Sequence, residues 1–211
     1  DRLAALVDIP PPGVPSYDEQ IISEELEHAF REINARRDRQ KHVYLLASGP
    51  PDGEYYPIFE SLITRVAVLK HRITARNLTT QGSVENARLI GRKEADYALM
   101  QSNLAALASA GEGPFAQGGM VTSLRALGSL FPEPVHIVVS AQSGIRTLAD
   151  LRGKRVAIGA PDSGTRADAL TVLAVHGLSP KDFAEVRDDG LEAAASQLQA
   201  GRLDAFFATV G

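Results

Sequence analysis

The chain has 211 residues, of which 44% are hydrophobic and 23% charged, as is usual for a globular protein with a buried core. Its 22 Lys and Arg residues against 26 Asp and Glu residues give a net charge of -4. This balance argues against a nucleic-acid-binding protein, which needs a basic face. The absence of Cys excludes disulfides and thiolate metal sites.

The first part of the chain, residues 1–41, is expected to be a linker followed by an amphipathic helix. Residues 8–15 are rich in Pro and therefore stiff. Ser16 and Glu19 have the spacing of a capping box, which marks the start of a helix. The apolar residues that recur at helical spacing after it are Ile22, Leu26, Phe30 and Ile33. Because the chain begins at Asp1, without a Met, we expect a signal peptide or a membrane anchor upstream.

From residue 42 onward, short apolar runs alternate with helical patterns. The expected strands are His42–Ser48, Ile73–Thr80, Asp96–Gln101, Val135–Ser140, Arg155–Ala160 and Asp204–Thr209. The expected helices are Tyr56–Leu69, Ser83–Gly91, Asn103–Ala110, Gly164–His176 and Leu191–Ala200. This alternation predicts an α/β fold in which helices cover both faces of a parallel sheet.

A short internal repeat suggests two related lobes. Residues 85–99 form a helix, a turn, an Asp and an apolar strand, and residues 192–207 repeat this order. We therefore expect lobe I at residues 42–138 and lobe II at residues 139–211.

Three strand-to-helix junctions share one chemical character. They lie at residues 48–57, 79–86 and 159–165, and each combines Gly with small hydroxyl residues or, in the first, with two Tyr. The first turn of a helix has unpaired N–H groups and a partial positive charge, so it can bind a carboxylate or phosphate without a basic side chain. Such junctions line the crevice at the carboxyl ends of the strands in an open α/β sheet. Together they predict an anion-accepting pocket.

Individual residues of these junctions also have simpler interpretations. Ser83 and Ser163 are equally suited to capping their helices, and Gly164 to forming a turn. We expect at least one of Tyr55 and Tyr56 to lend its ring or hydroxyl to the pocket, the alternative being packing under the sheet edge.

Gln101, at a strand end, either points into the same crevice or faces solvent.

No pattern in the sequence requires catalysis, so we expect a binding protein and not an enzyme, with no cofactor and no metal. The Gly159–Arg166 segment has Thr165 where a phosphate loop needs Lys. The five His residues are scattered, without metal-binding spacing. The one candidate pair of catalytic carboxylates, Glu85 and Asp162, is also what helix N-termini favour on dipole grounds alone.

With their surroundings, the junctions resemble the TAXI family of solute receptors for TRAP transporters. The resemblance rests on Gly49–Pro57, Gly82–Asn86, Asp96 to Ser102, Ser129–Glu133, Leu148–Val156, Ser163–Thr165 and Gly201–Phe207. It implies a type II periplasmic-binding-protein fold, with two α/β lobes that close over a ligand by a hinge. Chains of this family continue past a position like Gly211, so the resemblance also implies a truncated second lobe.

The resemblance further implies a small carboxylate or amino acid, similar to glutamate or glutamine, as the ligand and a membrane permease as the partner. The residues it places at the ligand are Tyr56, Ser83, Asn86, Gln101, Ser163, Gly164 and Thr165. The predicted function is an extracytoplasmic solute-binding protein, periplasmic or membrane-anchored, that binds no nucleic acid. The alternatives are a membrane-anchored ligand-sensing domain of the same fold, an enzyme acting on a small carboxylate, and a purely structural interaction module.

Overall fold

The computed structural model describes residues 16–69 and 73–210, and its contacts divide the chain into two units. The first unit comprises residues 1–43 and 72–74. Its helix α1 (Tyr17–Lys41) begins at the predicted capping box, in which the Glu19 N–H donates to the Ser16 hydroxyl and the Ser16 N–H to the Glu19 carboxylate. The Pro-rich segment at residues 8–15 lies outside the described residues.

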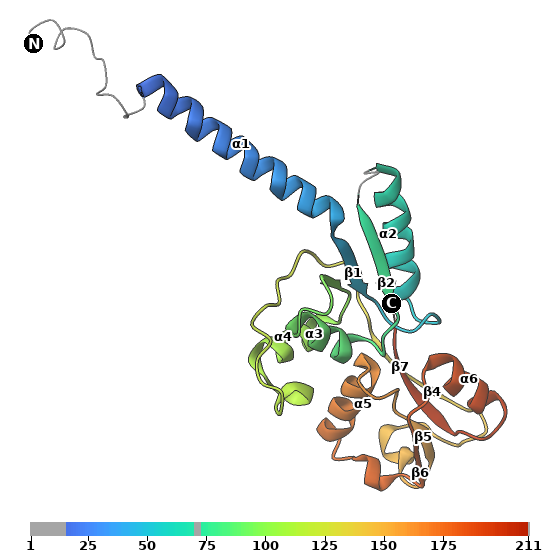
Figure 1. Ribbon diagram of the computed structural model, residues 1–211. Helices are drawn as coiled ribbons and strands as arrows, with labels where there is room; N and C mark the ends of the chain where they lie inside the picture. The colour runs from blue at the N-terminus through green and yellow to red at the C-terminus, as the bar shows by residue number, and fades with distance from the viewer. Residues whose placement is uncertain (1–15, 70–72, 211) are drawn as a thin grey trace, which may run out of the picture. The chain divides into compact units, whose positions relative to one another are not determined.

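The second unit, residues 44–71 and 75–211, contains nearly all of the first sheet. The strand order is β2-β1-β3, with β1 and β3 parallel. The strands are β1 (Val43–Ala47), β2 (Thr74–Leu78) and β3 (Tyr97–Ala98). The accompanying helices are α2 (Tyr55–Leu69), α3 (Ser83–Gly91) and α4 (Ser102–Ala110). A small core lies between α3 and α4, where Val84 and Leu104 are almost fully buried (Figure 1).

The second sheet has four strands in the order β4-β7-β5-β6. They are β4 (Val135–Val139), β5 (Arg155–Ala157), β6 (Glu185–Arg187) and β7 (Ala205–Thr209). The strand β4 is antiparallel to β7, whereas β5 is parallel to both of its neighbours. The sheet is therefore mixed, which corrects the expectation of a purely parallel one.

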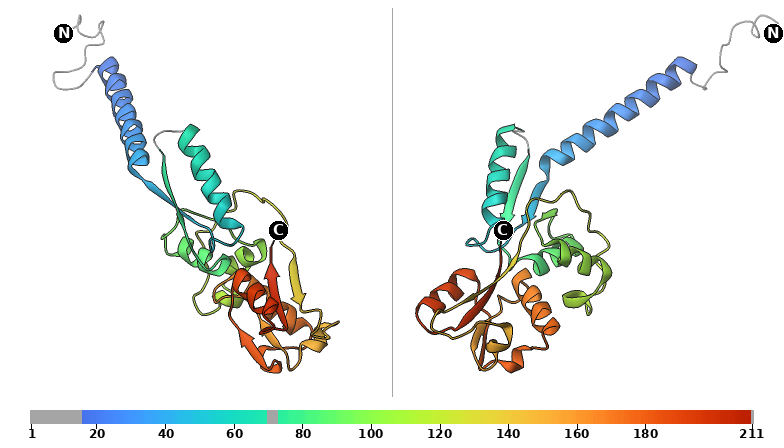
Figure 2. Two further views of the ribbon diagram at one scale, coloured as in Figure 1. Left: turned by 90° about the vertical axis from the view of Figure 1, so that its right-hand side faces the viewer. Right: turned by 180° about the vertical axis from the view of Figure 1, so that it is seen from behind.

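The second sheet is covered on both faces: successive side chains of a strand point to opposite faces, and four consecutive residues of β7 are buried. Phe207 packs in one core with residues of α5 (Gly164–Val175), and Phe206 in another core with residues of α6 (Leu191–Gln199). The view from behind in Figure 2 shows the two helices on opposite sides of the sheet.

Every predicted helix and strand of the described chain is confirmed, with ends shifted by a few residues. The strand β6 was not predicted, because its three residues sit at a sheet edge and two of them are charged. Short 3-10 helices lie at Gly113–Phe115, Leu148–Leu151 and Pro180–Asp182. The predicted boundary between lobes, at residues 138 and 139, falls inside β4, and the division into lobes stays a prediction.

The internal repeat has a structural counterpart in two equivalent Asp contacts. The Asp96 carboxylate accepts the Leu45 N–H at 2.8 Å, while the Asp96 N–H donates to the Leu45 carbonyl. Asp204 makes the same two contacts with Arg155, also with 2.8 Å from the Arg155 N–H to the carboxylate. In each copy the Asp follows a helix and a turn and clamps the neighbouring strand.

The turns of the two copies also match in backbone conformation, but not in residue type. Lys93 has φ +59° and Gly201, at the equivalent place, has φ +68°. This left-handed conformation costs a residue other than Gly about 1–2 kcal/mol. No atom lies within 4 Å of a Cβ added at Gly201, so the cost there comes from the backbone alone.

We therefore expect Lys93→Gly to raise the free energy of unfolding by about 1 kcal/mol, and Gly201→Lys to lower it by about as much. Urea unfolding of both variants measures the two changes. Equal stabilities of wild type and Gly201→Lys would contradict the equivalence of the two turns.

Candidate ligand-binding site

A cavity of about 440 Å³ lies where six strands end, within the usual size range of small-molecule sites. Its lining comes from the loops that follow β1, β2, β3, β5 and β6, from the first turns of the helices after some of them, from the end of β7, and from Glu133 just before β4. Carboxyl ends of strands are where open α/β sheets bind ligands, so the predicted location of the pocket agrees with this cavity.

The N-terminus of α5 supplies hydrogen-bond donors to this cavity. Ser163 caps the helix, since its hydroxyl accepts the Arg166 N–H at 3.1 Å and donates to the Ala160 carbonyl. Among the described residues, no acceptor is found for the N–H groups of Gly164 and Thr165, which both line the cavity. The two groups therefore remain available to an anionic ligand group.

Gln101 places an unsatisfied acceptor beside these donors. Its side chain is 7% exposed, and its Oε1 is buried without a hydrogen-bond partner among the described residues. The amide packs against the backbone of Gly164 so closely that a Cβ added there would lie 2.0 Å from Oε1. A buried polar atom without a partner is unfavourable, and a ligand with a donor group would remove that penalty.

Tyr55 and Glu133 form a polar pair in the same cavity. The Tyr55 hydroxyl donates to Glu133 Oε2 at 2.5 Å. Burial raises the pKa of Tyr55 far above its usual value, and the bond to Glu133 adds to that rise. Burial also raises the pKa of Glu133, with contributions from the charges of Glu54 and Asp168, while the bond from Tyr55 opposes the rise.

The charged side chains that line the cavity are all acidic. They are Asp52, Glu54, Glu133, Asp188 and Asp189, and the described lining contains no Lys, Arg or His. Asp188 is paired with Arg166, and Asp189 with Arg187.

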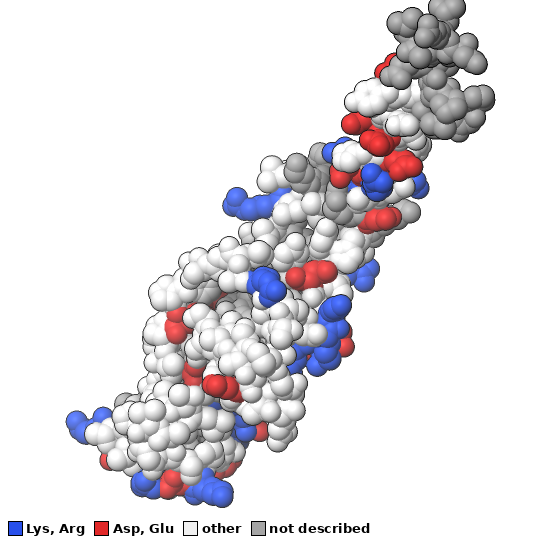
Figure 3. Space-filling view, turned by 90° about the vertical axis from the view of Figure 1, so that its left-hand side faces the viewer, with Lys and Arg blue, Asp and Glu red and all other residues white. Residues whose placement is uncertain are grey.

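On the face shown in Figure 3, the described Lys and Arg side chains form small scattered groups and no extended basic surface. The residues of the cavity and this outer face therefore offer no concentrated positive charge to an anion.

The structure brings six of the eight predicted site residues to the cavity. Those six are Tyr55, Ser83, Gln101, Ser163, Gly164 and Thr165, whereas Tyr56 and Asn86 lie outside the lining. Ser83 does not cap α3, because it is the first helical residue and its hydroxyl accepts the Gln101 N–H at 3.1 Å.

Asn86 is fully buried, and its amide bonds all go to the chain itself. Its Nδ2 lies 2.5 Å from the Ser48 carbonyl and 2.7 Å from the Leu99 carbonyl, and its Oδ1 accepts the Thr80 hydroxyl. This bonding indicates a structural role for Asn86. Its predicted contact with the ligand stays a prediction that the lining does not support.

The pair of carboxylates considered for catalysis is engaged in structural contacts. Asp162 pairs with Arg88 at 2.6 Å, and its carbonyl accepts the Glu85 N–H. The Glu85 carboxylate accepts the N–H of Gln81 at 2.7 Å. These contacts tie α3 to the loop before α5.

In the described part of the chain, no group of three His, Asp or Glu side chains is arranged to hold a metal ion.

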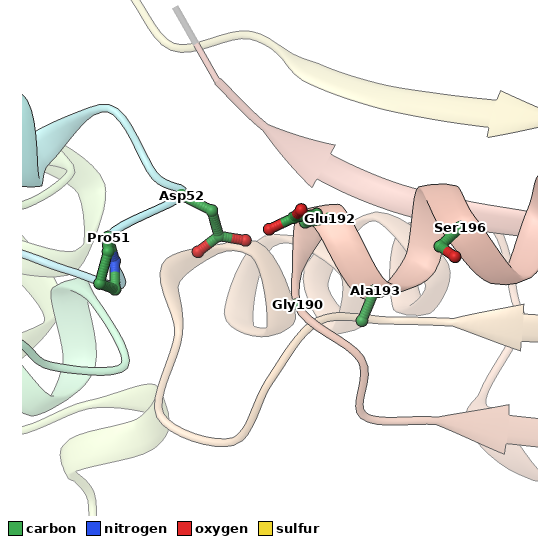
Figure 4. Close-up of a pocket in the computed structure, with 6 residues that line it drawn as sticks. All are labelled: Pro51, Asp52, Gly190, Glu192, Ala193 and Ser196. Carbon is green, nitrogen blue, oxygen red and sulfur yellow. The ribbon is translucent and has the colours of Figure 1, made fainter.

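An outer hollow of about 810 Å³ adjoins the mouth of the cavity. Its lining is Pro51, Asp52, Gly190, Glu192, Ala193 and Ser196. In Figure 4 the carboxylates of Asp52, on the loop after β1, and Glu192, in the first turn of α6, point toward one another. Two like charges that face each other repel, so these two carboxylates oppose a closer approach of the loop after β1 to the first turn of α6.

Sequence reasoning missed three parts of the lining: Glu133, the segment at residues 188–191 and the end of β7. Glu133 does belong to the Ser129–Glu133 segment that supports the family resemblance, and that segment was the only signal for it.

No helix in the described residues has the length and apolar character needed to cross a membrane.

Several solved binding proteins are similar to this chain in fold. An alkanesulfonate-binding protein from Xanthomonas axonopodis pv. citri, bound to MOPS, superposes with a TM-score of 0.52 at 21% identity over 77% of this chain and 53% of its own. A Prochlorococcus marinus protein in complex with methylphosphonate gives 0.52 at 12% identity, over 79% of this chain and 63% of its own. The binding component of an ABC phosphonate transporter from Pseudomonas aeruginosa gives 0.54 at 11% identity, over 80% and 58%.

These likenesses confirm the predicted α/β fold of the periplasmic binding proteins. The chain spans between 53% and 63% of the length of the three solved proteins. The sequence from residue 46 to residue 211, most of the chain, matches the model of one family. The chain therefore belongs to the NMT1-like family.

Proposed function

We propose that this protein is an extracytoplasmic solute-binding protein that captures a small carboxylate or amino acid in the cavity. One observation carries the proposal: the N–H groups of Gly164 and Thr165, which have no acceptor among the described residues, line the cavity together with Gln101, whose Oε1 finds no donor there. Leaving such groups unpaired in a folded protein is unfavourable, and a bound polar solute would satisfy them together.

The proposed site consists of Tyr55, Ser83, Gln101, Ser163, Gly164 and Thr165. We further propose that residues 42–138 and 139–211 act as two lobes that enclose the solute. Contacts between the two parts, such as the bond from Asn103 Nδ2 to Asp168 at 2.7 Å, support a closed arrangement of this kind.

A membrane permease is the proposed partner, and the TRAP type rests on the TAXI-like motifs alone. One solved protein with the same fold belongs to an ABC transporter, so the fold is compatible with both transporter classes. Binding without turnover is the expected behaviour.

Thermal unfolding of the purified protein against amino acids, dicarboxylates, alkanesulfonates, methylphosphonate and phosphate tests the proposal. A solute at 100 times its dissociation constant adds about 2.7 kcal/mol of stability. For a chain of this size we expect the midpoint to rise by about 5–10 °C with a carboxylate or an amino acid. NMR of the same mixture should show the solute unchanged.

Two results would count against the proposal. One is no shift with any compound while native mass spectrometry finds no trapped small molecule. The other is chemical conversion of the solute, which would favour the enzyme alternative.

A further inference from the structure

The cavity combines donors at one place with acceptors at another. The donors are the N–H groups of Gly164 and Thr165, and the acceptors are Gln101 Oε1 and the Glu133 carboxylate. A simple anion would satisfy the donors but would offer no hydrogen to Gln101 Oε1 or to the remaining lone pairs of the Glu133 carboxylate. The lining therefore favours a ligand that carries donor hydrogens as well as an anionic group.

Glu133 differs from Asp188 and Asp189, which also line the cavity. Asp188 and Asp189 have Arg partners, whereas no Lys, Arg or His of the described chain pairs with Glu133. Within the described chain it accepts a hydrogen bond from the hydroxyl of Tyr55 at 2.5 Å, which leaves further lone pairs able to accept hydrogen bonds. A half-buried carboxylate without a cation is unfavourable, because burial removes water from the charge.

The surroundings of Glu133 add to its negative potential. Both Glu54 and the buried Asp168 act on Glu133 with repulsive charge. Asp168 is held in place by bonds from Asn103 and Thr209. A positive group that entered the cavity next to Glu133 would be attracted by all three carboxylates.

Tyr55 fixes the Glu133 carboxylate close to the other polar groups of the cavity. The Ser83 hydroxyl accepts the Gln101 N–H at 3.1 Å, and it lowers the pKa of Tyr55, in opposition to burial and to Glu133. The bonded pairs Tyr55–Glu133 and Ser83–Gln101 therefore both line the cavity, and among the described residues no donor reaches Gln101 Oε1. The two acceptors thus belong to the lining of one cavity.

We propose that Glu133 is a specificity-determining residue that receives a cationic donor group of the ligand, such as an ammonium group. This inference rests on the proposed function and narrows it: the cavity selects solutes that carry both an ammonium and an anionic group over anions of the same size without the ammonium.

The test is isothermal titration calorimetry with matched pairs of compounds that differ only in the amino group. Suitable pairs are L-glutamate with glutarate and L-alanine with propionate, together with the other amino acids and their deaminated acids. We expect wild type to bind an amino acid at least about tenfold more tightly than its deaminated partner, since an unpaired buried charge is strongly unfavourable.

Glu133→Gln keeps the size and the acceptor for Tyr55 but removes the charge, so we expect it to abolish this preference. Glu133→Asp retains the charge and should retain part of the preference. Glu192→Gln is the matched control, because it removes a carboxylate from the outer hollow and not from the cavity, and it should leave the preference unchanged. Circular dichroism checks that each variant is folded.

The possible failures are distinguishable. If wild type binds a deaminated carboxylic acid as tightly as its amino acid, the role of Glu133 is refuted and the proposed function stands. If it binds propanesulfonate or methylphosphonate and no carboxylate or amino acid, the role of Glu133 and the proposed ligand class are both refuted. If a diamine such as putrescine binds and no carboxylate does, Glu133 keeps its role and the proposed carboxylate ligand is wrong. If none of the compounds binds and native mass spectrometry finds no trapped small molecule, the proposed function itself is refuted.

Discussion

Replacing Asn86 by Ala is expected to lower the free energy of unfolding by about 2–4 kcal/mol, because buried carbonyls lose their donor and a small void is left. The amide of Asn86 joins three parts of the first sheet region: the Ser48 carbonyl after β1, the Leu99 carbonyl after β3 and the Thr80 hydroxyl after β2. Its two amide hydrogens serve two of the nearby carbonyls at a time. The fall in stability is measured by urea unfolding.

Asn86→Asp is the control that separates shape from hydrogen bonding. It keeps the shape but replaces the donor with a carboxylate oxygen that faces carbonyl oxygens, so it should destabilise the protein at least as much as Asn86→Ala. If either variant kept wild-type stability but lost solute binding, that result would instead support the ligand contact that the family resemblance implies for Asn86.

Gly164→Ala is expected to weaken solute binding at least tenfold, equivalent to about 1.4 kcal/mol, while the fold is retained. The added Cβ would meet Gln101 Oε1 at 2.0 Å and its Cδ at 2.5 Å. Because the amide is the far end of a flexible side chain, it can swing aside at little energetic expense, but its Oε1 then leaves the wall of the cavity. Ala in place of Gly within a helix favours the fold by up to about 1 kcal/mol.

The matched control is Gly190→Ala, at the start of α6. Gly190 also lines the cavity and precedes a helix, but no atom lies within 4 Å of a Cβ added there. Its affinity should therefore remain close to that of wild type in the same titration. Wild-type affinity in Gly164→Ala would show that the position of Gln101 does not matter for binding.

Most of the candidate site was predictable because its signals are local. Ser163 followed by Gly164 marks a capped helix N-terminus from sequence alone, and the structure has this cap. The choice between Tyr55 and Tyr56 was not predictable in the same way. Adjacent residues of a helix point about 100° apart, so only the placement of α2 decides that Tyr55 lines the cavity.

The features that sequence reasoning missed depend on distant contacts. Glu133 meets Tyr55 across 78 positions of the chain, and no spacing rule connects the two. Asn86 lies within a motif that resembles a ligand site, and its hydrogen bonds to backbone carbonyls and to the Thr80 hydroxyl could not be read from the residue types. The antiparallel pairing of β4 with β7 likewise joins two segments that are far apart in the sequence, and no local pattern sets the direction in which they pair.

The paired Asp clamps bear on how the strands find their correct alignment during folding. Asp96 and Asp204 each bind both the N–H and the carbonyl of one particular residue on the neighbouring strand, Leu45 and Arg155. A slip of one residue turns every side chain of a strand to the opposite face, so a slipped β5 would lose the clamp together with the bond from the Arg155 side chain to Asp204. Each clamp thereby penalises misaligned strands. Only in the native register can the Asp of each copy of the repeat form both of its backbone hydrogen bonds.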